Sequence, residues 1–147
     1  LTNDAFDAFH KGRAYISSIE GELNDEQKAE LYAHRDKALQ AWEKAIAATA
    51  VHYINDMLGD LESDADFDVY AKHYSELKGF SLSLQFNRRS PLMENDGADF
   101  ARFHTLIGTS PVKATAEEEA QYVMDLNAAR DILATAYGFD ALDVADW

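Results

Sequence analysis

The 147-residue sequence contains no cysteine, which excludes disulfide bonds, thiolate metal sites and cysteine nucleophiles. Proline occurs only at Pro91 and Pro111, both in apparent loops, so the stretches between the breaks can form long helices. No apolar run reaches the roughly 20 residues that a membrane-spanning helix needs. Only 13 Lys and Arg residues accompany 27 Asp and Glu residues, giving a net charge of −14. Such a chain repels a phosphate backbone, so nucleic acid is not expected as a partner.

Several catalytic motifs are also missing from the sequence. It has no Gly-rich phosphate-binding loop, no Gly-x-Ser-x-Gly element and no His-Glu-x-x-His pair. Serine, histidine and aspartate all occur, but no spacing arranges them into a triad. The sequence therefore favours a protein that is not an enzyme, although it leaves the question open.

The composition between the breaks is rich in Ala, Leu, Glu, Lys and Gln, which favours helices. We expect an all-α fold, a helical bundle of about five helices that includes one very long helix. The expected helices cover residues 3–20, 24–58, a segment from Ser63 through Phe86, a short helix ending near Gly108, and a last helix from Thr115 to Gly138. Residues 87–97 are expected to form a loop.

Helix boundaries are indicated by capping residues. Asn24 is expected to cap the long helix, with Gln27 as its capping-box partner, and Thr115 with Glu118 should do the same for the last helix. Gly138 has the position of a C-terminal glycine cap. Ser63 and Asp66 give a further start signal, and the acidic residues around them fit a helix N-terminus.

Residues 80–86 alternate between apolar and polar, as a strand would. No partner strand is evident elsewhere, so we expect this segment to be helical.

Apolar residues at helical spacing predict the buried faces. In the first helix this stripe is Phe6, Phe9, Arg13 and Ile16; in the long helix it is Leu31, Ala38, Trp42, Ala45, Thr49 and Tyr53. In the last helix it is Tyr122, Leu126, Ala129, Leu133 and Ala136. The predicted core comprises Trp42, Tyr53, Phe67, Tyr74, Leu77, Phe103, Leu126 and Leu133.

The expected long helix would extend about 50 Å at 1.5 Å per residue. It carries aromatic residues on more than one face, so it needs more partners than this chain easily supplies. We therefore expect either a contact with a preceding part of the same protein or self-association through an apolar face. Because Leu1 is not an initiator methionine, we expect the sequence to be a processed form or a fragment of a longer protein.

The candidate metal ligands are His73 and Glu76, which lie three residues apart and so share one helix face. A divalent metal would need further ligands from another helix, and we expect His104 first, with His52 and Asp56 as alternatives. The competing interpretation is a surface His–Glu pair, or a histidine bonded to a neighbouring carboxylate. No other cofactor is indicated.

Several segments together resemble one family. They are residues 42–50, 72–87, 103–108, 128–133 and 136–139. The family is a domain of unknown function in bacterial envelope proteins, often lipoproteins, and it is similar to the all-helical imelysins. Residues 71–76 also resemble the imelysin Gly-x-His-x-x-Glu motif, with Ala71 in the glycine position. Family members usually carry a proline where this chain has Arg88.

The resemblance covers nearly the whole chain but matches only the C-terminal part of the family's longer domain. It therefore implies that residues 1–147 are one helical domain that forms the C-terminal portion of a larger domain. It also implies an imelysin-like bundle, located in the periplasm or anchored to the outer membrane. It suggests a non-enzymatic protein that binds a ligand, a metal or a partner. Two alternatives remain at this point, a metal-dependent hydrolase of imelysin type and a purely structural bundle.

Overall fold

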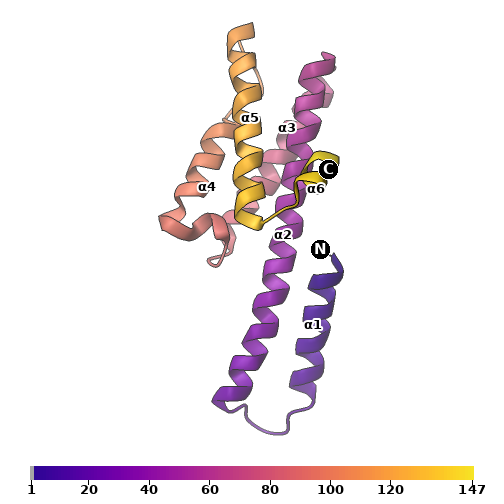
Figure 1. Ribbon diagram of the computed structural model, residues 1–147, viewed down its shortest axis with the longest axis vertical. Coiled ribbons are helices and arrows are strands. Elements are labelled where there is room, and N and C mark those ends of the chain that lie inside the picture. Colours follow the sequence, from indigo (N-terminus) through magenta and orange to yellow (C-terminus); the bar gives the residue numbers. More distant parts are fainter. Residues whose placement is uncertain (1) are drawn as a thin grey trace. The chain divides into compact units, whose positions relative to one another are not determined.

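A computed structural model describes residues 2–147, and within them the fold is entirely helical with no strand (Figure 1). The α-helices are α1 (Thr2–Ser17), α2 (Asp25–Ser63), α3 (Phe67–Ser83), α4 (Glu94–Ile107), α5 (Ala116–Tyr137) and α6 (Ala141–Asp146). Two short 3-10 helices lie between α3 and α4, η1 (Leu84–Phe86) and η2 (Pro91–Met93). The all-α prediction and the single very long helix are confirmed. The sixth helix, α6, was not predicted.

The chain divides into two compact units, Leu1–Ala45 and Ile46–Trp147, and α2 contributes to both. We describe each unit by itself. That residues 1–147 form a single domain stays a prediction. No helix among residues 2–147 is long and apolar enough to cross a membrane, in agreement with the sequence.

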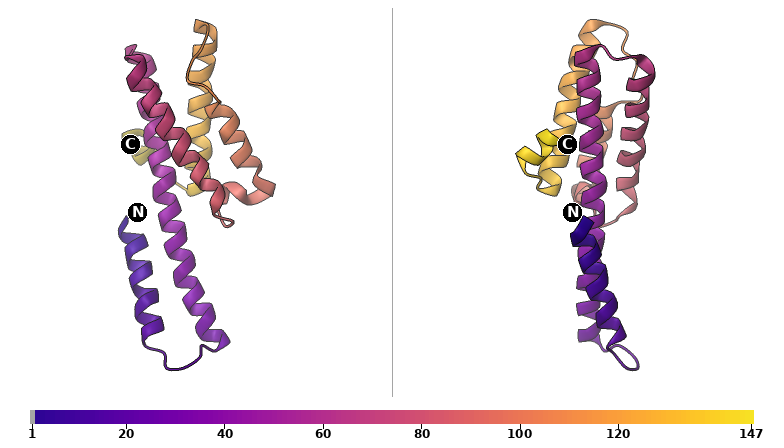
Figure 2. Two further views of the ribbon diagram at one scale, coloured as in Figure 1. Left: turned by 180° about the vertical axis from the view of Figure 1, so that it is seen from behind. Right: turned by 90° about the vertical axis from the view of Figure 1, so that its right-hand side faces the viewer.

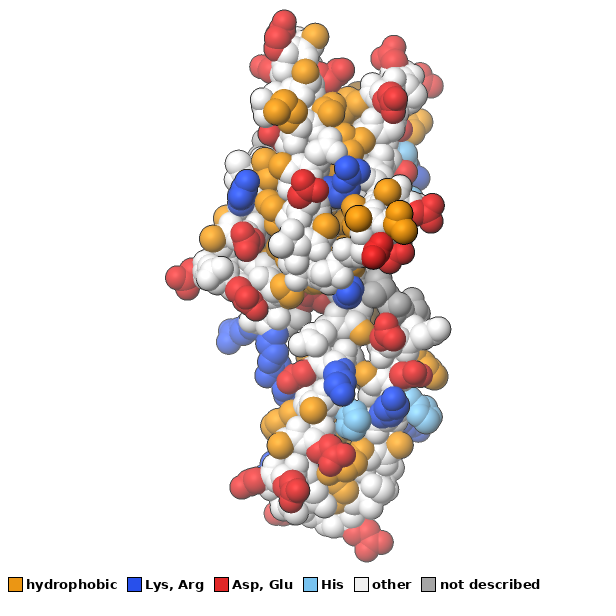
Figure 3. All heavy atoms as spheres, in the orientation of Figure 1, with side chains coloured by type: hydrophobic (Ala, Val, Ile, Leu, Met, Phe, Trp, Pro, Cys, Tyr) orange, Lys and Arg blue, Asp and Glu red, His pale blue; other side chains and the backbone are white. Residues whose placement is uncertain are grey.

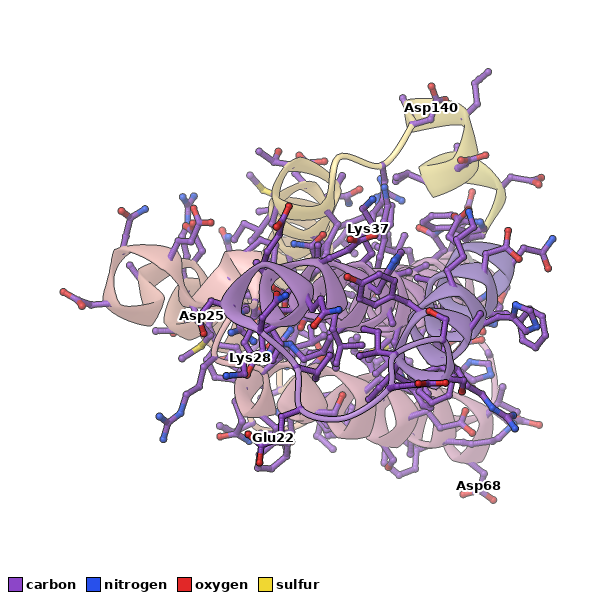
Figure 4. The ribbon with its side chains drawn as sticks, turned by 90° about the horizontal axis from the view of Figure 1, so that it is seen from below. Glu22, Asp25, Lys28, Lys37, Asp68 and Asp140 are labelled. Atoms are coloured by element: carbon purple, nitrogen blue, oxygen red, sulfur yellow. The ribbon has the colours of Figure 1, made fainter. Side chains whose placement is uncertain are left out.

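The first unit is an antiparallel hairpin of α1 and the N-terminal part of α2 (Figures 1 and 2). The predicted capping box is present: the Gln27 amide donates to Asn24 Oδ1 at 2.8 Å, and the Asn24 amide donates to Gln27 Oε1 at 3.0 Å. In the same turn Lys28 lies 3.5 Å from Asp25 (Figure 4). The helices approach closely at Gly12, where an added Cβ would lie 3.1 Å from the Cβ of His34.

The second unit contains the hydrophobic core, built from the C-terminal part of α2 and from α3, α4, α5 and α6 (Figure 2). Its fully buried apolar side chains include Ile54 and Met57 of α2, Leu77 of α3, Phe103 of α4 and Leu126 of α5. Helix α6 begins at Asp140, whose carboxylate accepts the Leu142 amide at 2.8 Å (Figure 4), and it contributes Val144 to the core. This unit positions the predicted metal ligands.

The segment with alternating polarity is helical, as predicted. Helix α3 runs to Ser83 and continues directly into η1. Leu77, Ser81 and Leu84 are buried at helical spacing, whereas Phe80 and Phe86 face solvent. The alternating apolar residues therefore lie on different sides of a helix, some buried and some exposed, and do not form one face of a strand.

Several helix ends agree with the sequence. Thr115 Oγ1 accepts the Glu118 amide at 3.2 Å at the start of α5. Gly138 ends α5 in the left-handed region, and the Phe139 amide donates to Ala134 O at 3.0 Å. The segment 87–97, predicted as a loop, contains η2, which was not predicted. It also contains the start of α4, where Asn95, Asp96 and Gly97 have left-handed backbone angles and kink the helix.

Ser63 and Asp66 mark the boundary between α2 and α3, as predicted, but neither side chain caps the N-terminus of α3. Ser63 is the last residue of α2, and its hydroxyl donates to Gly59 O at 2.8 Å. Asp66 precedes α3 but forms no side-chain capping bond. The acidic residue Asp60, which was assigned to a helix start, lies inside α2.

Two members of the predicted core are wrong. Trp42 is 67% exposed and Phe67 is 58% exposed, while Tyr53 is half-buried. The other five predicted core residues are buried, namely Tyr74, Leu77, Phe103, Leu126 and Leu133. In α2 the buried face consists of other residues than the predicted stripe: Ala47, Ala50, Val51, Ile54 and Met57.

The predicted stripe of α1 is wrong as a buried face. Phe6 is 68% exposed and Phe9 71%, and Arg13 and Ile16 are also exposed. The buried positions of this helix are instead Ala8 and Gly12, small residues that allow α2 to approach.

Candidate functional site

The predicted ligand His73 lies on α3 and faces two carboxylates of α2. Its Nδ1 is 2.7 Å from Oδ2 of Asp60, and its Nε2 is 3.9 Å from Oδ2 of Asp56. Both partners of the shorter contact are well shielded, with side-chain exposures of 18% for His73 and 12% for Asp60. Because a carboxylate only accepts, Nδ1 of His73 carries the proton in this contact.

His52 adds a second imidazole to this cluster. Its Nε2 lies 3.2 Å from Oδ2 of Asp56, which is thereby shared between two histidines, and its Nδ1 is 3.0 Å from Trp147 O. We call His52, Asp56, Asp60 and His73 the imidazole–carboxylate cluster. The alternative ligands His52 and Asp56 thus lie in one cluster with His73.

Glu76 is directed to a different group. It lies near the hydroxyl of Tyr53 on α2, and burial, followed by the charge of Glu76, raises the pKa of Tyr53 above its usual value. The Tyr53 ring stacks on Phe80 with centroids 5.7 Å apart and lies 6.2 Å from the His73 ring. Oε2 of Glu76 is buried and has no hydrogen-bond partner among residues 2–147, and Lys72 Nζ is 3.9 Å away.

His104 of α4 contacts α3 at another level. Its Nε2 is 3.3 Å from Ser81 O, and its ring packs on Phe100 with centroids 4.3 Å apart. Burial lowers the pKa of His104, and the nearby Lys78 lowers it further, against the opposing effect of the Ser81 carbonyl. Ser81 is eight residues beyond His73, about 12 Å further along the helix axis.

The structure therefore brings His73 together with Asp60, Asp56 and His52, and it gives Glu76 and His104 other partners. Within residues 2–147, no group of three or more His, Asp or Glu side chains is arranged to hold a metal ion. Metal ligation by His73, Glu76 and His104 stays a prediction. The competing interpretation of a histidine bonded to a neighbouring carboxylate describes the observed geometry of His73.

A second candidate site lies in the first unit, and the sequence did not indicate it as a site. A groove of about 420 Å³ runs between α1 and α2. Its lining consists of Ala8, Phe9, Gly12, Arg13, Ile16, Leu31, His34, Arg35, Ala38 and Leu39. We call it the hairpin groove. Figure 3 shows hydrophobic side chains at the surface of the hairpin, interspersed with charged ones.

Exposed apolar side chains extend the groove at one end. Phe6 precedes Phe9 by three residues on α1, and Trp42 follows Leu39 by three residues on α2. Since the two helices are antiparallel, both extensions lie toward the same end of the hairpin. The signal that could have revealed this face was Arg13, a charged residue within an otherwise apolar stripe, which fits an exposed surface better than a core.

Further polar contacts of α3 stabilise the second unit. Tyr74 Oη and Lys78 Nζ both donate to Gly108 O, at 3.2 and 2.9 Å. Burial lowers the pKa of Lys78. These bonds join α3 to the C-terminal end of α4. Gly108 itself has φ 70°, in the left-handed region that favours glycine.

Comparisons with protein families, with curated proteins and with solved structures found no match for this chain.

Proposed function

We propose that this chain is a non-enzymatic helical bundle of the bacterial cell envelope that binds a protein partner through the hairpin groove. The observation that carries the proposal is the exposure of large apolar side chains around one groove: Phe6, Phe9 and Trp42 are each about two-thirds exposed. Burying a side chain of this size contributes about 1.5–3 kcal/mol to an association. The envelope setting rests on the family resemblance alone.

Contiguity distinguishes this face from ordinary exposed apolar residues. Single exposed hydrophobic side chains are common on proteins, whereas a contiguous apolar face is typical of an interaction surface. Phe86 and Leu142 are also strongly exposed, at 80% and 81%, but they do not line this groove. The residues of the hairpin groove line one cavity together and come from two helices.

A test uses a synthetic amphipathic helical peptide with leucines on one face and glutamines on the other. We expect the peptide to bind the whole chain, measured by fluorescence anisotropy of a labelled peptide. Phe9→Glu should abolish this binding because it places a charge in the apolar lining. Phe86→Glu is the matched control, since it changes an equally exposed phenylalanine outside the groove, and it should bind like the parent. Failure of the parent to bind amphipathic helices of any flanking charge would overturn the proposal.

A second candidate function is a metal-dependent hydrolase of imelysin type, and one observation favours it. Histidines that ligate metals commonly donate their other ring nitrogen to a carboxylate, as His73 does to Asp60. The buried oxygen of Glu76 without a hydrogen bond lies one helical turn from His73. Turnover of a peptide substrate that Glu76→Gln abolishes would establish this function and displace the first proposal.

A further inference from the structure

We infer that the partner of the hairpin groove is an amphipathic α-helix whose apolar face is flanked by carboxylates. This inference rests on the proposed function and adds the chemistry of the partner. It follows from the juxtaposition of an apolar groove with Arg13 and Arg35 in a chain that is otherwise strongly acidic.

The charges that line the groove have one sign. Its two ionised residues are Arg13 of α1 and Arg35 of α2, and its lining contains no carboxylate. This composition is unusual for a sequence with 27 acidic and 13 basic residues. Three further cavities of the described residues all contain carboxylates, among them Asp60, Asp7 and Asp131.

The two arginines differ in the number of hydrogen bonds and ion pairs that they form within the chain. Arg35 bonds Asp36 through Nε at 2.8 Å and Nη2 at 2.7 Å, and its guanidinium lies 4.4 Å from the Tyr32 ring. Arg13 forms no ion pair or hydrogen bond with any of residues 2–147 through its side chain, and it is exposed. A carboxylate on a bound partner would give Arg13 the charge-assisted bonds that it lacks.

The shape of the groove fits a helix better than a small ligand. From Phe9 to Ile16 the wall formed by α1 spans about two helical turns, and Phe6 adds a third. Two antiparallel helices with a furrow between them offer a third helix a place in a bundle. Recognition of an amphipathic helix by apolar anchors at three- and four-residue spacing is a recurring mode of peptide binding.

The same charges disfavour a second copy of the chain as the occupant. Face-to-face pairing of two hairpin grooves would bring two sets of arginines to one interface with no carboxylate from either lining. Like charges at an interface oppose association, and opposite charges favour it. Self-association is therefore an outcome that the experiment must be able to detect.

The experiment compares three labelled peptides of about 15 residues, long enough to span the groove. All three share the same leucine face and differ only in flanking residues, which are glutamate, glutamine or lysine. We expect the glutamate peptide to bind the whole chain at least about tenfold more tightly than the lysine peptide, with the difference shrinking as salt is added. Arg13→Glu should remove this preference. Arg88→Glu makes the same change in net charge at an exposed site of the second unit and should retain it.

The outcomes separate this inference from the proposed function. Equal affinity for all three peptides, lost in Phe9→Glu, would overturn the acidic partner and leave the binding function standing. No binding by any peptide would overturn both. Concentration-dependent dimerisation by sedimentation velocity that Phe9→Glu abolishes, without peptide binding, would assign the groove to a second copy and overturn the inference. A stoichiometric complex with laurate that prevents peptide binding would show that the groove binds an acyl chain, and it would also overturn the inference.

Discussion

Nδ1 of His73 lies 2.7 Å from Oδ2 of Asp60, and this contact joins α2 to α3 across the turn that connects them. The stacked pair Tyr53 and Phe80 lies seven residues further from the turn on each helix. Because the two contacts are seven residues apart on both helices, they fix one antiparallel register for α2 and α3. His73, which the sequence indicated by its spacing to Glu76, therefore forms a contact between α3 and α2.

Metal content tests whether His73 also serves as a ligand. If the chain holds zinc, iron or calcium, we expect elemental analysis to find it in the parent and to find much less in His73→Ala. Because ligation requires a neutral imidazole, the metal content should also fall on acidification. Ser75→Ala, at an exposed position of the same helix whose hydroxyl bonds only Ala71 O, is the control. Equal metal in His73→Ala and the parent, or none in the parent, would leave His73 with the structural role described above.

Truncating Phe103 should destabilise the protein far more than truncating Trp42. Phe103 is fully buried, so Phe103→Ala should lower the free energy of unfolding by about 3–5 kcal/mol. Trp42 is 67% exposed, so Trp42→Ala should change it by no more than about 0.5 kcal/mol. Chemical denaturation with a helical circular-dichroism readout measures both. A loss for Trp42→Ala as large as that for Phe103→Ala would contradict the assigned core.

His104 should make stability depend on pH. Its pKa is lowered in the folded state, mainly by burial, so the unfolded chain binds more protons and the free energy of unfolding rises with pH. This contribution is fully present above the ordinary histidine pKa, and it is lost as the pH falls through the lower folded value. His104→Gln should flatten this part of the curve, measured by denaturation at a series of pH values. A curve for His104→Gln identical to that of the parent would refute the assignment.

Gly108 and Gly79 should respond oppositely to alanine. Gly108 has φ 70° and ψ −173°, a conformation that strains any other residue, so Gly108→Ala should cost about 1–3 kcal/mol. Gly79 lies within α3 with no atom near its would-be Cβ, so Gly79→Ala should stabilise the protein by up to about 1 kcal/mol. Thermal unfolding of the two variants beside the parent measures the signs. Stabilisation by Gly108→Ala would show that this backbone conformation is not required.

The sequence predicted helix type and helix ends well because these depend on neighbouring residues. Asn24 with Gln27, Thr115 with Glu118 and Gly138 all act within a few residues of themselves, and all three signals are present in the structure. The alternating segment 80–86 was resolved correctly by the lack of a partner strand.

Buried faces were harder to predict because α2 carries apolar residues on more than one side. Its buried face includes the small residues Ala47 and Ala50, whereas the larger side chain of Trp42 is exposed to solvent. Which side is covered depends on distant segments, and spacing within the helix does not determine it. The sequence allowed for a histidine bonded to a neighbouring carboxylate, but it did not identify Asp60 as the partner of His73, because that pairing depends on the register of two helices.

The most direct test of the account follows Trp42 during binding of the glutamate-flanked peptide. Trp42 and Trp147 are the two tryptophans of the chain, so Trp147→Phe leaves Trp42 as the sole tryptophan, whose emission is read by exciting at a wavelength that tyrosine does not absorb. Because Trp42 is exposed at the end of the hairpin groove, its emission should shift to shorter wavelength as the peptide covers it, and Phe9→Glu should prevent the shift. Unchanged Trp42 emission at saturating peptide would contradict the claim that this face is the binding surface.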